Sequence, residues 1–156
     1  MPSVVSQDQV GPHTPISSLE FLTLRYPGKT TLSVTITAAL NARHAASTGG
    51  AIVTPLAAFV PMDGYHLTRA QLDAMPDPAT AHARRGAEFT FDGEGFLKLV
   101  QALREPITGE TSTILAPSFD HAIKDPKEDD IAVTPTQRIV VFEGNCKPFP
   151  LPTLLG

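Results

Sequence analysis

The chain has 156 residues, of which 42% are hydrophobic and 18% charged, so it is long and apolar enough for one domain with a sizeable core. Its net charge of −4 argues against a nucleic-acid-binding module, which carries a clustered basic surface. Its single cysteine, Cys146, excludes an intramolecular disulfide and a cysteine-rich zinc site. With no bilayer-length apolar run and no signal-peptide pattern, we expect a cytoplasmic protein with no membrane partner.

The first part of the chain alternates strand, helix and strand. We expect residues 1–15 to be a flexible lead-in and residues 16–24 to form a strand. Apolar residues at helical spacing predict a helix over 29–46. The expected buried face of this helix consists of Leu32, Ile36, Ala39 and Leu40. The apolar segment 51–62 predicts a strand buried on both faces, whose regular part begins after Pro55.

The middle of the chain is rich in turns before a clear helix. Residues 63–91 are mixed, with one helical turn expected at 68–74. Asp92 is a good N-cap for a helix over 93–104. The buried stripe of that helix is predicted to be Phe96, Leu97, Val100 and Leu103.

The last part contains the strand with the clearest pattern. We expect a short strand at 113–116, a charged loop at 117–137 and a strand at 138–142. Residues 146–156 form a proline-rich tail, which we expect to be disordered. The order of elements predicts one α/β domain over 16–145, with a parallel sheet and covering helices.

The segment Gly28-Lys29-Thr30-Thr31 lies between an expected strand and an expected helix. A helix N-terminus offers unpaired N–H groups to phosphate, a lysine there can reach the β- and γ-phosphates, and the next hydroxyl can bind Mg²⁺. The full phosphate-binding pattern has a further glycine where this chain has Thr23. By itself the segment is also compatible with a helix start that carries a solvated lysine.

Two acidic residues follow apolar strands. Asp63 comes directly after segment 51–62, where an aspartate can take the proton of an attacking hydroxyl, although Asp-Gly is also a common turn. Glu143 follows strand 138–142, as does the Walker B-type acid that lies near metal and phosphates, although a surface acid can end a core strand. We predict that Lys29, Asp63 and Glu143 share the carboxyl edge of the sheet.

Further polar residues lie in the expected loops. Arg84 and Arg85 could clamp an anionic substrate or the transferring phosphate, although a solvated loop is the simpler interpretation. The five histidines show none of the spacings typical of zinc sites.

Taken in order, these segments resemble one branch of the P-loop kinases. GKTT, PMDGYHLTRAQLD, RRG, SFDHAIKDP and VVFEGN are similar to the phosphoribulokinase/uridine kinase/pantothenate kinase-like family, over about residues 28–145. The resemblance implies a P-loop NTPase-type three-layer α/β fold. It also implies ATP and Mg²⁺ as cofactors, and a small molecule with a hydroxyl group, such as a nucleoside, vitamin or sugar, as phosphoryl acceptor.

The resemblance also implies roles for individual residues. The nucleotide-binding loop would consist of Gly28, Lys29, Thr30 and Thr31. Lys29 would act in catalysis by neutralising phosphate charge, with Asp63 as the base, and Mg²⁺ would lie beside Thr30 and Glu143. The acceptor pocket would be lined by Asp63, His66, Arg84, Arg85, Phe119, Asp120 and His121.

The chain departs from the family pattern at both ends of this region. The glycine-rich GxxGSG start is replaced by residues 23–27, and the helices and arginine-bearing lid of the family are replaced by the tail at 146–156. Misplaced exon boundaries or alternative splicing would produce such abrupt changes, so we expect an incomplete fold. The alternative to a kinase is therefore a non-catalytic remnant that binds or regulates. We predict Mg·ATP affinity that is at best millimolar, and no measurable turnover by this polypeptide.

Overall fold

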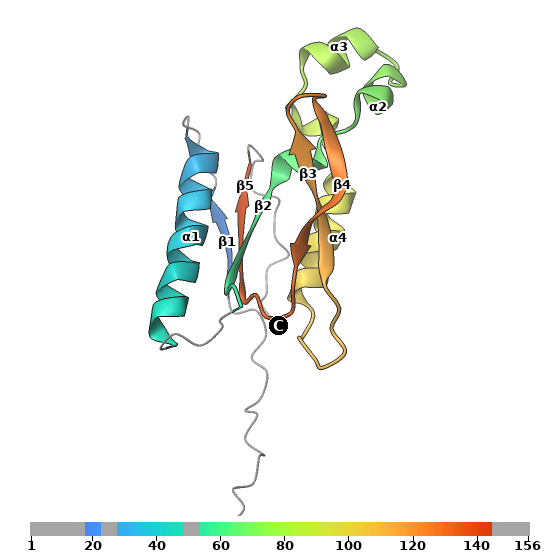
Figure 1. Cartoon of the computed structure of the whole chain (residues 1–156). Helices are drawn as coiled ribbons and strands as arrows, with labels where there is room; N and C mark the ends of the chain where they lie inside the picture. The colour runs from blue at the N-terminus through green and yellow to red at the C-terminus, as the bar shows by residue number, and fades with distance from the viewer. Residues whose placement is uncertain (1–17, 23–27, 49–53, 145–156) are drawn as a thin grey trace, which may run out of the picture.

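The computed structural model in Figure 1 describes residues 18–22, 28–48 and 54–144. The expected lead-in at 1–15, the altered segment 23–27 and the tail at 146–156 lie outside the described residues. The helices and strands are, in chain order, β1 (Ser18–Leu22), α1 (Lys29–Ser47), β2 (Ala57–Pro61), α2 (Arg69–Asp73), α3 (Pro78–Ala83), α4 (Gly93–Arg104), β3 (Ile114–Asp120), β4 (Asp125–Val133) and β5 (Ile139–Glu143). Two short 3₁₀ helices, η1 (Met62–Tyr65) and η2 (Glu88–Thr90), follow β2 and precede α4. Within these ranges, no helix has the length and apolar character needed to cross a membrane.

Three strands form a parallel sheet in the order β1-β5-β2. The last residue of β5, Glu143, lies level with Leu22 of β1 and with Pro61 of β2. Strands near 16–24, 51–62 and 138–142 are thereby confirmed, with bounds that differ by a few residues. Because the strands are parallel and in register, their carboxyl ends meet at one edge of the sheet.

Helix α1 covers one face of this sheet, and its bounds confirm the predicted helix (Figure 1). The predicted buried face is wrong at two of its four positions, because Leu32 is 41% exposed and Ala39 is also exposed. Ile36 and Leu40 are half-buried, and the fully buried residue of the helix is Ser33. Asn41 binds the helix to the first residue of β2. Its side-chain oxygen accepts from the Ala57 N–H at 2.8 Å, and its side-chain nitrogen donates to the Ala57 carbonyl at 3.0 Å. Ser33 and Asn41 therefore dock α1 on the sheet. Because both are polar, the spacing of apolar residues does not identify them.

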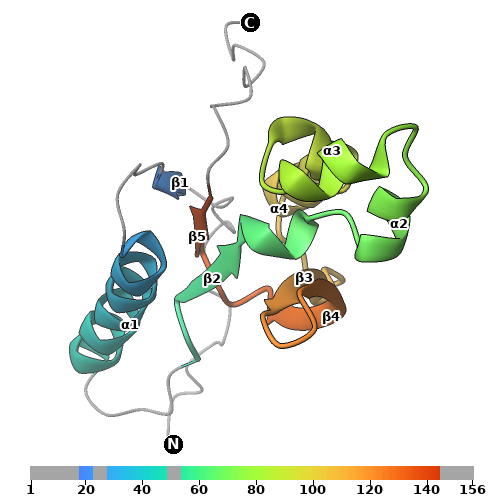
Figure 2. The ribbon, with the colours of Figure 1, turned by 90° about the horizontal axis from the view of Figure 1, so that it is seen from above.

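Helix α4 lies on the opposite side of the strands from α1 (Figure 2). The Asp92 carboxylate accepts from the Gly95 N–H at 2.9 Å, which confirms the predicted N-cap. The buried residues of the helix are Phe96, Leu99, Val100 and Leu103. The prediction of Leu97 is wrong: it is 45% exposed, because positions 96, 99, 100 and 103 follow the spacing of one helix face and 97 does not. The Phe96 ring packs edge-on against Phe142 of β5, with centroids 5.3 Å apart.

Strands β3 and β4 form a separate antiparallel hairpin beside α4. The prediction of a loop over 117–137 is therefore wrong, and the strand expected at 113–116 does not join the parallel sheet. The charged segment 125–130 lacks the apolar alternation of a strand, but its backbone pairs with β3, and Ala116 and Val133 anchor the hairpin in the core. Local composition could not show this pairing, because it depends on a partner strand.

Two short helices lie between β2 and α4. The predicted helical turn at 68–74 is confirmed as α2, which begins with a capping box between Thr68 and Gln71. Helix α3 was not predicted, although Asp77 accepts from the Thr80 N–H at 3.0 Å and Pro78 occupies the first turn. Together these two residues are a standard helix-start signal.

Candidate functional site

The first two residues of α1 meet the last residue of β5 at the carboxyl edge of the sheet. The Thr30 hydroxyl donates to Glu143 Oε2 at 2.9 Å, and Lys29 Nζ lies 3.8 Å from Glu143 Oε1. The Glu143 side chain is only 7% exposed, so these contacts offset the cost of burying its carboxylate. The structure therefore brings Glu143 to Lys29 and Thr30, from which it is at least 113 residues away in sequence.

Gly28 and Thr31 are the other two residues of the expected nucleotide loop. Gly28 is the N-cap of α1 and has a φ of 98°, a left-handed conformation that favours glycine. Its carbonyl accepts from the Leu32 N–H at 2.9 Å. Thr31 is exposed, and its carbonyl accepts from the Thr35 hydroxyl at 2.7 Å. The preceding residues 23–27 lie outside the described residues.

A glycine follows each of the two acids, and both glycines lie in close contacts. A Cβ on Gly64 would lie 2.3 Å from the carbonyl oxygen of Pro117 in β3. A Cβ on Gly144 would lie 2.6 Å from the Cβ of Met62. The end of β5 therefore packs directly against η1, and η1 packs against the hairpin. These contacts place Asp63 at the same edge as Glu143.

Asp63 borders a group of aromatic rings. Its carboxylate is 44% exposed and lies 3.9 Å from Nδ1 of His66, which also lies 2.9 Å from the Asp63 carbonyl oxygen. The His66 ring packs on Phe91 at a centroid distance of 4.0 Å and on Phe119 at 5.2 Å. His121 is exposed, and its ring contacts Phe119 at 5.1 Å. The arrangement combines a solvent-accessible carboxylate with an aromatic wall.

The two neighbouring arginines have different positions. Arg85 donates to the carbonyls of Lys124 at 2.5 Å and Leu67 at 2.9 Å, and to the carboxylate of Asp125 at 3.1 Å. Its guanidinium carbon also lies 5.6 Å from the centroid of the Phe119 ring. Arg84 is exposed, and its guanidinium lies over a different ring, that of Phe89, at 5.7 Å. Only Arg85 therefore contacts the hairpin and the aromatic group.

Asp120 holds the turn of the hairpin. One of its carboxylate oxygens accepts from the N–H groups of Ala122 at 2.8 Å and Ile123 at 3.3 Å. Lys124, at the end of the turn, has a φ of 58°. Asp120 thereby fixes the shape of the turn that faces α2 and α3.

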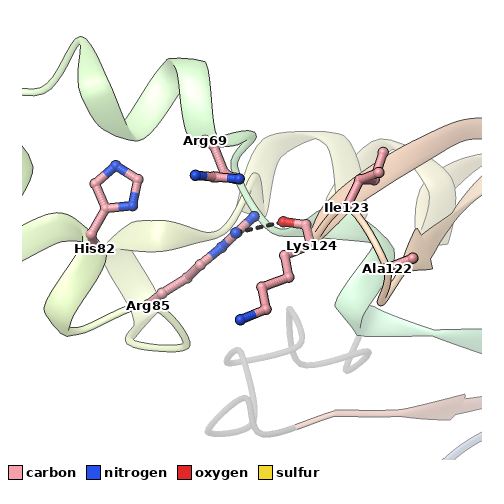
Figure 3. A pocket seen from close by; sticks show the side chains of 6 residues that line it. All are labelled: Arg69, His82, Arg85, Ala122, Ile123 and Lys124. Atoms are coloured by element: carbon pink, nitrogen blue, oxygen red, sulfur yellow. Dashed lines mark hydrogen bonds between the residues drawn. The ribbon is translucent and has the colours of Figure 1, made fainter.

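A pocket of about 580 Å³ opens between this turn and the α2–α3 segment (Figure 3). It is lined by Arg69, His82, Arg85, Ala122, Ile123 and Lys124. Of these residues, sequence analysis singled out only Arg85. The signal for Lys124 was present in SFDHAIKDP, but interpreting 117–137 as a loop concealed that Lys124 lies at the tip of a hairpin.

The residues at the edge of the sheet fit a magnesium ion that accompanies a nucleotide. Among the described residues, no three His, Cys, Asp or Glu side chains are grouped as a protein-only metal cage. The Thr30 hydroxyl and the Glu143 carboxylate are hard oxygen donors that lie together. Mg²⁺ commonly takes one or two protein ligands of this kind, together with phosphate oxygens.

Comparisons with known proteins find relatives that are named as kinases or kinase-like proteins. No family model matches the chain. It is 69% identical over 83 residues to the ATP-dependent kinase-like protein notR' of Aspergillus versicolor, which is 53% of this chain and 48% of that protein. The chain spans about half the length of curated relatives such as this one.

Two crystal structures resemble the fold. One is a candidate fructose transport system kinase from Silicibacter, with a TM-score of 0.60 and 32% identity over 90% of this chain and 57% of that one. The other is YFH7 from Saccharomyces cerevisiae, described as a candidate P-loop-containing kinase with a circular permutation, with a TM-score of 0.50 and 27% identity over 90% of this chain and 55% of that one. The chain is therefore a P-loop kinase-like protein with a partial P-loop NTPase-type α/β fold.

Proposed function

We propose that this chain carries the site of an ATP-dependent small-molecule kinase of the phosphoribulokinase/uridine kinase-like type. The reaction is transfer of the γ-phosphoryl group of ATP to a hydroxyl group of a small acceptor. The main supporting observation is that Lys29 and Thr30 meet Glu143 at the carboxyl edge of a parallel sheet, beside the segment that carries Asp63. Ligands in open α/β sheets bind at this edge.

The proposed roles follow from the chemistry of each group. The Lys29 ammonium and the N–H groups at the start of α1 attract the phosphates of ATP, and Gly28 lets the backbone turn into the helix. Thr30 and Glu143 would hold Mg²⁺, which supplies neutralisation of phosphate charge when bound. Asp63 accepts the proton of the acceptor hydroxyl as the oxygen attacks the γ-phosphorus, and ADP leaves. Its 44% exposure lets a substrate approach the carboxylate.

A second candidate function is phosphate or acceptor binding without turnover. Two apolar residues of α1, Leu32 and Val34, are 41% and 49% exposed, so part of the nucleotide-side helix has no apolar cover within the described residues. Phosphoryl transfer requires a closed, water-free site, whereas simple binding does not. This observation favours a binding or regulatory role as the alternative.

Calorimetric titration with Mg·ATP tests the proposal. We expect Lys29→Met to weaken Mg·ATP by about tenfold or more, since a charge-assisted contact contributes about 1.5–3 kcal/mol. Lys98→Met, which removes an exposed lysine from α4, is the matched control and should leave the affinity unchanged. Because we expect an affinity that is at best millimolar, the titration extends through the millimolar range. No detectable Mg·ATP binding in that range, or equal losses in both variants, contradicts a nucleotide site at Lys29.

Phosphoryl transfer to a panel of nucleosides, vitamins and sugars separates the two candidate functions. Because we expect no measurable turnover by this polypeptide, the assay uses a variant to which the GxxGSG loop start and the arginine-bearing lid of the family have been restored. If the site is that of a kinase, Asp63→Asn in this restored variant should abolish product formation while the Mg·ATP affinity stays the same. Glu88→Gln, at an exposed position in η2, provides the control for loss of one carboxylate. Mg·ATP binding by the restored variant without transfer to any acceptor supports the binding role instead.

A further inference from the structure

The pocket beside the hairpin turn is strongly cationic. Arg69, Arg85 and Lys124 line it, and none of its lining residues is acidic. These three belong to the 12 Lys and Arg of a chain whose net charge is −4. Such a concentration of positive charge in one concave place attracts anions.

Two of these cations are not used in holding the fold together. Within the described part of the chain, neither the Arg69 guanidinium nor the Lys124 ammonium has a hydrogen bond or ion pair with another residue, although the Arg69 N–H donates to Asp125 at 2.8 Å. Arg85 donates to the hairpin through its two terminal nitrogens, although its buried Nε has no partner among the described residues, and His82 is 2.7 Å from the Asp73 carboxylate. Figure 3 shows the Arg69 and Lys124 side chains on two sides of the Arg85 guanidinium.

The protein fixes the backbone of both cations before any ligand is bound. Asp125 accepts from the Arg69 N–H, and the same carboxylate oxygen accepts from Arg85, which also bonds to the Lys124 carbonyl. Arg85 is thus a positioning residue that ties the start of α2 to the end of the hairpin turn. Fixed backbones reduce the entropy cost of closing two long side chains on an anion.

A continuous set of contacts connects this pocket to the proposed base. The Arg85 guanidinium lies over Phe119, Phe119 packs on His66, and His66 contacts Asp63. The pocket is therefore on the acceptor side of the site. The Glu143 side, where α1 begins, is the nucleotide side.

We propose that the phosphoryl acceptor is an anionic hydroxyl compound, a phosphate ester or a carboxylate, whose negative group is held by Arg69 and Lys124. This inference rests on the proposed kinase function. Ala122 and Ile123 complete the wall and contact the carbon part of the ligand, since Ile123 is 59% exposed at the pocket. A neutral nucleoside or sugar would leave the two cations without a counterion.

Binding measurements in a Lys29→Met background test the proposal without interference from the nucleotide site. The probes are two pairs: ribose 5-phosphate with ribose, and gluconate with glucose. We expect at least one anionic probe to bind about tenfold more tightly than its neutral partner, and more weakly as salt is raised. The pair that discriminates identifies the anionic group as phosphate or carboxylate.

A matched pair of double variants assigns this binding to the pocket. Arg69→Gln with Lys124→Gln should weaken the anionic probe by about tenfold or more. Arg43→Gln with Lys98→Gln removes the same charge from exposed positions on α1 and α4 and should change the affinity less than about twofold. Arg69→Lys should recover part of the binding, since it restores the charge.

Three outcomes overturn the inference: equal losses in the two double variants, equal binding of anionic and neutral probes, and no binding of any anionic probe. A failure of the kinase proposal would be seen in a different measurement, the titration of the chain with unmodified Lys29 against Mg·ATP. Mg·ATP binding without preference for anionic probes removes only the inference about the acceptor. Anion binding in the pocket without Mg·ATP binding removes the kinase and leaves an anion-binding pocket.

Discussion

The edge of the parallel sheet and the hairpin pocket hold their charged residues by different means. At the edge of the sheet, Glu143 ends a strand buried between two neighbours, so strand register and apolar packing fix its position. In the hairpin region, Arg85 and Asp125 join three loop ends through polar contacts. The first region depends on the core, and the second on a few hydrogen bonds at the surface.

This difference has a functional consequence. Packed strands cannot move their ends separately, so the edge of the parallel sheet, the proposed nucleotide side, should be rigid. Short helices and turns joined by hydrogen bonds can be altered by one substitution, which makes the proposed acceptor side the easier place to change specificity. The following predictions test the comparison, from the largest expected effect to the smallest.

Phe142→Ala should destabilise both regions together. Phe142 is 1% exposed, precedes Glu143 and packs edge-on against Phe96, so the free energy of unfolding should fall by about 3–5 kcal/mol. Leu97→Ala, at a position that is 45% exposed on α4, should change it by less than about 0.5 kcal/mol. Urea denaturation measures both, and similar losses would contradict the assigned core.

Arg85→Met should loosen the hairpin region selectively. Its loss leaves the carbonyls of Leu67 and Lys124 without this donor and removes the ion-pair partner of Asp125, whose carboxylate keeps only the Arg69 N–H among the described residues, so the free energy of unfolding should fall by about 3 kcal/mol. Arg84→Met removes an exposed arginine one residue away and should cost less than about 1 kcal/mol. Amide exchange in β3 and β4 should accelerate only in the Arg85 variant, and faster exchange in β5 as well would show that the regions are coupled.

Gly28→Ala at the edge of the sheet and Gly86→Ala in the hairpin region should each lower the free energy of unfolding by about 1–2 kcal/mol. Their φ angles are 98° and 102°, and a Cβ would have nothing within 4 Å, so the cost is backbone strain alone. Gly109→Ala is the control, because it has open space and no positive φ. In thermal unfolding, the Gly28 and Gly86 variants should lose similar amounts of Tm, and more than the Gly109 control. An unchanged Tm for Gly28→Ala would rule out the left-handed start of α1.

Acid should weaken the hairpin through Asp130. Hydrogen bonds from Lys127 and from the Ser118 hydroxyl, the latter at 2.6 Å, lower the pKa of Asp130 below its ordinary 3.8. The stability from these contacts is therefore present above pH 3.8 and is lost as pH falls through the lower folded pKa. Asp130→Asn should slightly reduce the drop in Tm between about pH 6 and about pH 2. Asp129→Asn next to it is the control, and equal changes in both variants would contradict the assignment.

Several features of the site could be predicted from short patterns. Gly28-Lys29-Thr30 comes after one strand and Glu143 is the last residue of another, and a parallel sheet brings such positions to one edge. The cap at Asp92 and the turn after Thr68 were predictable because their hydrogen bonds are local. Arg69 and Lys124 could not be predicted in the same way, because the pocket they line exists only when α2 meets the hairpin turn.

The sequence by itself determined where most helices and strands begin, because caps, glycines and apolar spacing act within a few residues. Only the tertiary structure decided that β5 lies between β1 and β2, that segment 125–133 pairs with β3, and that Ser33 and Asn41 dock α1. Strand pairing and helix docking depend on surfaces that are distant in the chain, and several partners can satisfy the same local pattern. The pocket beside the hairpin turn belongs to this second class, since three separate segments must come together before its charges face one cavity.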